Sequence, residues 1–476
     1  MIADCVQSSL IPTDTVALWS AATLDCLAQL LGTANITLGH VEELLEAQSR
    51  KLMLPILRAA AQAMAAQQLF VCPVCGKPLA MEAKKRPRTL DSVFGALGFK
   101  RDYGWCPKCK QYFHPADHAM GLAPGAAATP RVQEIAARLS ARSPYAQASK
   151  DASRLTGVSV NPSTLHREAL RQADKAIQCR EADVALSKTL EGAAQLSARS
   201  QTASLNPFTL IIEIDAWNIR ERDDWGATDT LRAKGIEPER WHWVYTATVF
   251  RLDQRTQTQS GRPAITQRKY VATRQGLDEF THQLYAEALS CGLLNAKEVL
   301  VIADGAIWIW NLAQSRFKEA KQRVDLYHVK EHLHELARAL HPQDAQAREQ
   351  WLAPLLRYLE SRNDGALDVL CELKDVSLKL NNLTSAQHEA IDREIGYFTT
   401  HHKRMDYKRG KAAGEPVGSG AVESTARQYQ TRFKCTGQYW TLAGDESLLA
   451  LATLDRNDRW HRLYPHIPAQ SSGPQN

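Results

Sequence analysis

The order of strand-like and helical segments between residues 208 and 329 constrains the fold of this chain more than any other feature. Its strand-like runs, each a short and largely apolar stretch, are 208–217, 241–252, 269–274, 298–306 and 322–329. Segments with helical spacing separate the third run from the fourth and the fourth from the fifth. Short apolar runs bounded by turn residues are typical of buried strands. The resulting β-β-β-α-β-α-β order predicts a mixed α/β architecture in which helices cover a sheet.

Helical periodicity dominates on both sides of this region. Apolar residues spaced three and four apart predict helices within 1–70, within 131–180 and from 330 to about 400. Residues 186–207 are rich in Ala, Ser and Gln and lack aromatic side chains, so we interpret them as a linker.

Composition and length narrow the class of protein. Hydrophobic residues make up 44% of the 476 residues and charged residues 23%, which is typical of globular chains and not of disordered ones. No apolar run approaches the roughly 18 residues that a membrane helix needs. The N-terminus carries no basic region ahead of its apolar residues, so no secretory signal is predicted. We therefore expect a multidomain cytoplasmic protein without a membrane partner.

Two Cys-x-x-Cys pairs predict a metal site. Cys72 and Cys75 form the first pair, and Cys106 and Cys109 form the second, with 30 residues between the pairs. Thiolates two residues apart on a tight turn each occupy one edge of a tetrahedron, and two such pairs complete a structural zinc site. The spacing fits a zinc ribbon with an intervening hairpin. Redox-active or simply buried thiols are the alternatives.

A helix-turn-helix candidate follows the cysteine pairs. A turn at 157–159 separates two helical patterns, and Asn161 is placed to cap the second helix with Pro162 in its first turn. The first two turns of a recognition helix meet base edges in the major groove. The side chains expected to face outward there are those of Ser163, Thr164, His166 and Arg167. An ordinary three-helix packing unit is the alternative.

Three acids stand at the ends of predicted elements. Asp215 and Asp304 end two apolar strands, whose ends would be adjacent in a parallel arrangement. Glu423 lies in the first turn of a late helix that begins after a Gly-Ser-Gly break. Carboxylate oxygens select Mg²⁺ or Mn²⁺, and two such ions assist in-line phosphoryl transfer. Each acid alone has a structural explanation, namely a turn or a favourable interaction with a helix dipole.

Five segments resemble the DDE transposases of bacterial insertion sequences, most closely the Kra-type group. The matching segments are EIDAW, VIADGAIWIWNLA, VDLYHVKEHL, VGSGAVES, and TRFKCTGQYW running on to ALATLDRNDRW. They occur in the family's order, and with the cysteine pairs they span residues from about 70 to 465. One departure is Ala216, where many relatives have Gly after the first acid.

The resemblance implies an RNase H-like α/β catalytic domain with a mixed sheet and an all-helical insertion before the third acid. It implies that Asp215, Asp304 and Glu423 form a catalytic triad holding Mg²⁺ or Mn²⁺. Asp325 and His328 match an Asp-x-x-His element of the same catalytic site. The implied division is a helical region (1–70), a zinc ribbon (71–120), a helix-turn-helix region (131–185), the linker (186–207), the first part of the catalytic core (208–329), a helical insertion (330–412), the last part of the core (413–465) and a flexible tail (466–476).

The expected partner is duplex DNA, both insertion-sequence ends and target DNA, bound by a homo-oligomer. Arg427, Arg432 and Lys434 follow Glu423 on a cationic helix and join the recognition helix as expected DNA contacts. Two further basic clusters occupy 84–88 and 401–411, and each could instead be a solvated face. No phosphate-binding Gly-rich loop with Lys occurs, so no nucleotide cofactor is expected.

Two other functions remain open. His328, Glu331 and His332 spell His-x-x-Glu-His, a zinc metallopeptidase pattern. A zinc ribbon with a helix-turn-helix would also suffice for a DNA-binding regulator without catalysis.

Overall fold

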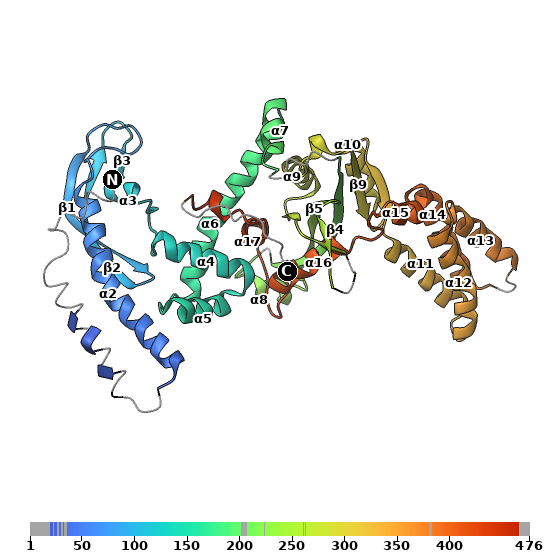
Figure 1. Ribbon diagram of the computed structural model, residues 1–476, viewed down its shortest axis with the longest axis horizontal. Coiled ribbons are helices and arrows are strands. Elements are labelled where there is room, and N and C mark those ends of the chain that lie inside the picture. The colour runs from blue at the N-terminus through green and yellow to red at the C-terminus, as the bar shows by residue number, and fades with distance from the viewer. Residues whose placement is uncertain are drawn as a thin grey trace. The chain divides into compact units, whose positions relative to one another are not determined.

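The computed structural model describes residues 36–200, 207–222, 224–259, 261, 263–379 and 383–465, with a few shorter pieces between 20 and 32. The chain divides into two compact units, Met1–Ala173 and Asp174–Asn476. Figure 1 traces the elements of each unit by residue number. The expected tail 466–476 and the first 19 residues lie outside the described part of the chain.

The first unit begins with a long helix on a small sheet. Helix α2 (Leu38–Ala66) starts at Thr37, whose side chain accepts a hydrogen bond from the His40 amide. Strands β1 (Ala80–Ser92), β2 (Gly95–Cys106) and β3 (Gln111–Phe113) form an antiparallel sheet in that order. Ala61 of α2 is buried with Leu97 and Phe99 of β2, so apolar burial joins helix and sheet. The hairpin predicted between the cysteine pairs is thus β1–β2.

Three helices complete the first unit. They are α4 (Pro130–Arg142), α5 (Tyr145–Thr156) and the start of α6 (Pro162–Leu186), preceded by the short α3 (Pro115–Ala119). Gly157 ends α5 in the left-handed conformation, with φ of 65°. Asn161 Oδ1 accepts a hydrogen bond from the Thr164 amide at 2.8 Å, which confirms the predicted cap of α6. Ala136 of α4, Ala148 of α5 and Leu165 of α6 are buried in a common core.

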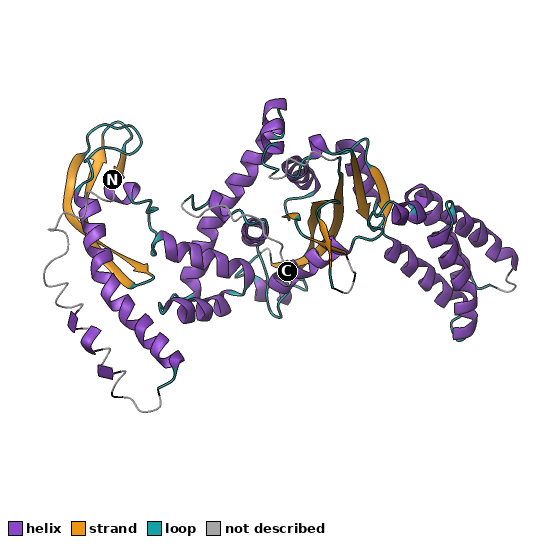
Figure 2. Ribbon diagram, viewed as in Figure 1, coloured by secondary structure: helices purple, strands orange, loops and turns teal. Residues whose placement is uncertain are grey.

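The second unit is built on a five-stranded mixed sheet with the order β10-β9-β4-β5-β8. β4 is antiparallel to β5 and parallel to β9, and β10 is parallel to β9. The strands are β4 (Thr209–Arg222), β5 (Glu239–Arg251), β8 (Lys269–Thr273), β9 (Glu298–Ala303) and β10 (Lys321–Val324). Figure 2 shows this sheet with its surrounding helices. The predicted mixed α/β layer architecture is confirmed.

Smaller elements interrupt the predicted order without changing it. Helix α8 (Thr228–Ala233) follows β4, and a hairpin of β6 (Arg255–Gln257) and β7 (Pro263–Ile265) follows β5. The strand expected over 322–329 ends at Val324, because Asp325 caps the next helix with its side chain. Helices α9 (Leu277–Ser290) and α10 (Ile307–Arg316) occupy the predicted helical stretches.

The linker expected over 186–207 contains a helix, α7 (Leu190–Ser197). Thr189 caps it by accepting a hydrogen bond from the Gly192 amide at 3.0 Å. Leu196 is fully buried, in a cluster with Ala286 and Leu289 of α9. The linker prediction is therefore wrong for these residues: an Ala-rich segment has high helix propensity, and one leucine is enough to dock it.

The predicted helical region 330–412 is confirmed as a group of helices, which Figure 1 shows gathered beyond β9. They are α11 (Leu326–Leu340), α12 (Ala345–Ser361), α13 (Gly365–Lys379), α14 (Ser385–His401) and α15 (Tyr407–Ala412). Their buried leucines join the core of the sheet in one cluster. Two helices then return to the sheet, α16 (Gly420–Phe433) and α17 (Leu442–Arg456). Among the described helices, none is long and apolar enough to cross a membrane.

Candidate functional site

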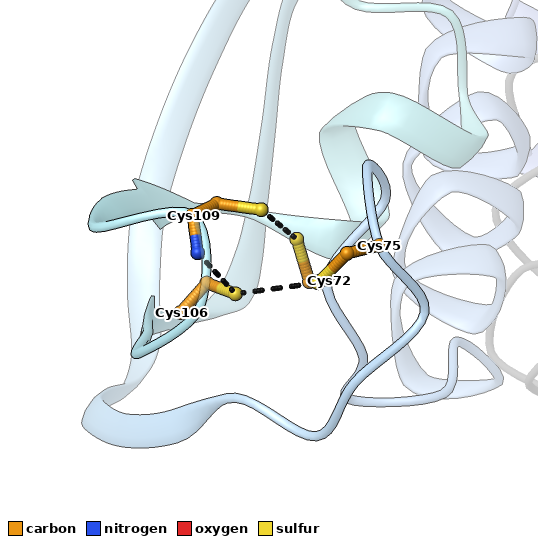
Figure 3. Close-up of side chains that lie close together, drawn as sticks. All are labelled: Cys72, Cys75, Cys106 and Cys109. Carbon is orange, nitrogen blue, oxygen red and sulfur yellow. Dashed lines mark hydrogen bonds between the residues drawn. The ribbon is translucent and has the colours of Figure 1, made fainter.

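The four paired cysteines converge on one point of the first unit (Figure 3). Their sulfur atoms all lie within 4.8 Å of one another. Cys72 Sγ is 3.8 Å from Cys109 Sγ, and Cys75 Sγ is 3.6 Å from Cys106 Sγ. Such a set of four thiols could hold a metal ion such as Zn²⁺, which thiolates bind tetrahedrally.

Backbone turns hold the cysteines in place. The Gly76 amide donates to the Cys72 carbonyl at 2.9 Å, and Gly76 has a φ of +70°, which favours glycine. The Lys110 amide donates to the Cys106 carbonyl at 2.8 Å in the second turn. The Cys109 amide donates to Cys106 Sγ at 3.4 Å, and this interaction lowers the pKa of the Cys106 thiol, whereas the neighbouring sulfurs and burial raise the pKa of the Cys109 thiol. A lowered thiol pKa favours the thiolate that binds metal.

The first two acids of the predicted triad meet at one edge of the sheet. β4 and β9 run parallel with Glu213 opposite Ile302, so Asp215 and Asp304 lie two residues further along adjacent chains. The Asp304 side chain accepts a hydrogen bond from the Ala306 amide at 2.9 Å and ends the strand in a turn. β4 runs on to Arg222, so Asp215 lies in the middle of this strand, opposite Thr246 of β5, and the prediction that it ends the strand is wrong. Asp304 directly follows the last residue of β9, as the sequence predicted.

The third acid reaches this edge from α16. Asp325 Oδ2 accepts hydrogen bonds from both the amide and the hydroxyl of Ser419, each at 2.5 Å. The Ser419 hydroxyl also lies 3.2 Å from Glu423 Oε1. Asp325 is almost fully buried, and its amide donates to the Ala303 carbonyl at the end of β9. A chain of hydrogen bonds therefore joins the end of β9 to the helix turn that carries Glu423.

Electrostatics also indicate that the acids are close. Burial, together with the negative charges of Asp304 and Glu423, raises the pKa of Asp215 to about 6. Glu423 remains partly exposed, with 45% of its side chain accessible, and lies 3.7 Å from Arg427. A half-buried carboxylate group with mutual repulsion favours the binding of a cation.

Three contributors to this region were not predicted from sequence. Glu213 is buried in β4 and accepts a hydrogen bond from the Val422 amide at 2.9 Å, which fixes the start of α16. Burial raises the pKa of Glu213 to about 8. Ser419 bridges two acids, and the Tyr397 hydroxyl of α14 donates to the Asp304 carbonyl at 3.3 Å. The one sequence feature that could have pointed to these residues was Glu213 itself, an acid inside an apolar strand.

The acids are spaced more widely than the cysteines. Among the described residues, the cysteine cluster is the one group of three or more such ligands whose atoms all lie within 4.8 Å. A site with two ions about 3.5–4 Å apart and ligand bonds of about 2 Å accommodates oxygens up to about 8 Å from each other. The donor chemistry, three carboxylates at one edge, fits hard cations.

His328 and His332 lie near each other on α11, with ring centroids 4.9 Å apart. His332 Nδ1 is 2.8 Å from Glu394 Oε2, and its ring stacks on Tyr397 at 4.1 Å. His328 Nδ1 lies 3.6 Å from the exposed carboxylate of Glu331. His332 thus packs against α14, and within the described chain these histidines join no group of three close metal ligands.

The residues expected to contact DNA fall into two groups, exposed and buried. Ser163, His166 and Arg167 are exposed on α6, and Arg427 and Lys434 are exposed on or after α16. Thr164 is only 6% exposed, because it faces the helical core beside Leu165. Arg432 is 2% exposed, and its guanidinium lies 5.3 Å from the ring of Trp440. Burial therefore corrects the prediction for Thr164 and Arg432, which cannot reach DNA.

Two sites of different chemistry result, one of thiols in the first unit and one of carboxylates in the second. Thiols suit a structural zinc ion, whereas carboxylates suit ions that take part in phosphoryl transfer. Comparison of the chain with protein-family models finds no match, and comparison with curated protein sequences finds none either.

Proposed function

We propose that this protein is a transposase that binds the ends of an insertion sequence and catalyses metal-dependent DNA cleavage and strand transfer. The observation that carries the proposal is that the β4–β9 register places Asp215 and Asp304 at the same level, and that hydrogen bonds from Asp325 through Ser419 lead from the end of β9 to Glu423. The three acids are 89 and 119 positions apart in the sequence. The five-stranded mixed sheet is compatible with an RNase H-like domain. The helices from α11 to α15 would then be the insertion before the third acid.

We call the group formed by Asp215, Asp304 and Glu423 the acidic edge, and its residues and their neighbours have separate roles in this proposal. Asp215, Asp304 and Glu423 would hold Mg²⁺ or Mn²⁺ through their carboxylate oxygens. When bound, two such ions activate the attacking oxygen and stabilise the leaving oxygen of an in-line displacement. Asp325 positions Glu423 through Ser419, and His328 lies one turn into the helix that Asp325 caps. The attacking oxygen belongs first to water and then to a 3′ hydroxyl, so no covalent protein–DNA intermediate forms.

The distribution of charge supports DNA binding by the first unit. Residues 71–173 contain 16 Lys and Arg but only 7 Asp and Glu, whereas residues 174–476 contain 39 of each kind. Residues 1–70 contain 3 Lys and Arg and 6 Asp and Glu, so the whole net charge of +6 belongs to the first unit. Basic surface supplies most of the affinity for duplex DNA and makes it depend steeply on salt. Ser163, His166 and Arg167 are the exposed α6 residues that would read base edges.

Nicking of a labelled duplex tests the proposal. The duplex carries the inverted repeats that bound the reading frame, and wild-type protein is expected to cleave it with Mg²⁺ or Mn²⁺ and not with Ca²⁺. Asp215→Asn and Asp304→Asn should each abolish cleavage, and the double variant should lose no more than either single one, because the acids act as a unit. Cleavage by both single variants at the wild-type rate would refute the proposal. End binding without any cleavage by wild type would favour a DNA-binding regulator.

Specificity has its own test. Arg167→Ala should weaken binding to the element end more than binding to random duplex, if Arg167 reads a base. An equal loss on both duplexes would assign Arg167 to the phosphate backbone.

A further inference from the structure

A row of aromatic side chains lies on the small sheet of the first unit, at the β2–β3 end. It consists of Trp105, Tyr112, Tyr103 and His114, which we call the aromatic row. Trp105 and Tyr112 are cross-strand partners with ring centroids 4.7 Å apart. Tyr103 stacks on Tyr112 at 5.1 Å and contacts His114 at 4.5 Å. Tyr112 is 51% exposed, which is high for a ring of its size.

The two faces of this part of the sheet serve different purposes. Successive strand residues point to opposite faces, so Cys106 and Phe113 turn away from Trp105 and Tyr112. Cys106 and Phe113 pack into the cluster that surrounds the paired cysteines. Leu97 and Phe99 share the face of Tyr103 and Trp105 on β2, and both pack into the core under α2. Further along this face the aromatic row lies outside both buried clusters, with Tyr112 exposed and Trp105, Tyr103 and His114 half-buried.

One cation contacts the aromatic row, and the small sheet that carries the row is basic. The guanidinium of Arg86 lies over the Tyr103 ring, 5.0 Å from its centroid. Residues 71–120 hold nine Lys and Arg against four Asp and Glu. Arg88 and Arg101 are engaged by the buried Asp117 and serve the fold. The remaining exposed cations of the three strands and the second cysteine turn are Lys84, Lys85, Arg86, Lys100, Lys108 and Lys110.

We infer that the aromatic row, through its exposed ring of Tyr112, binds unpaired bases of single-stranded DNA, with Arg86 and the other exposed cations of this basic sheet attracting its phosphates. Exposed aromatic rings in a positive surface stack on bases of any sequence, and only bases outside a duplex offer their faces. The inference rests on the proposed function for its choice of DNA, and it adds a second kind of substrate structure. Unpaired nucleotides arise wherever DNA ends are opened or nicked.

The test is equilibrium binding of the full chain to a fluorescently labelled single-stranded oligonucleotide, without added Mg²⁺ or Mn²⁺. Tyr112→Ala is the test variant, and Tyr112→Phe is its matched control because it keeps the ring. Stacking on one base corresponds to an increase of roughly 5- to 150-fold in Kd on removal of the ring. Tyr112→Phe should stay within about twofold of wild type. Zinc content is measured in each variant so that an unfolded ribbon is recognised.

The Kd values are also measured for a duplex and for an RNA strand of the same sequence. The Kd for duplex of the same sequence should change less than about threefold in Tyr112→Ala, because stacked bases do not reach the ring. Equal losses on single strand and duplex would overturn the inference, as would tighter binding of RNA than of DNA or an unchanged Kd in zinc-loaded Tyr112→Ala. These binding measurements do not depend on DNA cleavage, because no Mg²⁺ or Mn²⁺ is added. If they fail while metal-dependent nicking persists, only this inference falls; if nicking fails while they succeed, only the proposed function does.

Discussion

Asp325→Asn perturbs the residue that ties the edge of the sheet to α16. One carboxylate oxygen of Asp325 accepts from the amides of Tyr327 and His328, at 2.5 and 3.1 Å. The other accepts twice from Ser419. Asparagine has a single acceptor oxygen, so its NH₂ would face the Ser419 amide, which loses its acceptor in a buried position, while the Ser419 hydroxyl can turn to accept from the NH₂. A hydrogen bond to a charged group contributes about 1.5–3 kcal/mol, so the loss is at least about 1.5–3 kcal/mol.

Urea unfolding at neutral pH measures this loss as a lower transition midpoint at unchanged slope. Hydrogen exchange gives a local readout, with faster exchange expected at the amides of Ser419 and Tyr327. Asp344→Asn is the matched control, since Asp344 caps α12 in an exposed position with one bond, to the Ala347 amide at 2.9 Å. Asparagine caps helices well, so the control should lose under about 0.5 kcal/mol. Equal losses in the two variants would refute the argument from the Asp325 network.

Three further predictions concern the metal, α7 and pH. Elemental analysis should find zinc bound to the wild type, and Cys106→Ser should lose this zinc. The variant's ribbon should unfold, because a structural zinc site contributes about 10–16 kcal/mol of apparent binding energy. A wild-type protein without zinc would contradict the site. Leu196→Ala should destabilise the protein by about 2–5 kcal/mol in urea unfolding, whereas Leu190→Ala should have little effect because Leu190 is 87% exposed; equal effects would mean that α7 is not docked. Burial and the neighbouring Glu221 raise the pKa of Asp445 to about 9, so the folded state holds this proton more tightly; the contribution of Asp445 to stability should fall as pH rises from about 4 to about 9, and Asp445→Asn should lose less stability over this range than the wild type.

Local sequence predicted the parts of the fold that depend on neighbouring residues. Apolar runs located β4 and β9, and the parallel arrangement that would bring Asp215 and Asp304 together is the one that the structure has. Asp215 and Asp304 were expected to be neighbours at two strand ends, but β4 continues past Asp215 to Arg222, and the apolar pattern did not predict this extension. The cap at Asn161 and the turn at Gly157 were also readable, because both depend on side-chain chemistry within a few residues.

Features that depend on distant partners were missed. The rotation of α6 and α16 decides that Thr164 and Arg432 are buried, and helical spacing alone does not fix which face meets the core. The Leu196 contact with α9 stabilises a helix in a segment that composition assigned to a linker. Glu213 had no partner in its own strand, since the Val422 amide that it accepts from lies 209 residues away. Tertiary packing overrides local preference in each case.

The measurement that bears most directly on the account is Mg²⁺-dependent nicking of an element end by Glu423→Gln. Glu319→Gln is its matched control, an exposed glutamate that precedes β10 and so lies away from the acidic edge. The account predicts that Glu423→Gln binds the end with wild-type affinity but does not cleave it, while Glu319→Gln cleaves normally. Cleavage by Glu423→Gln at the wild-type rate would contradict the claim that Asp215, Asp304 and Glu423 form one metal-dependent catalytic site.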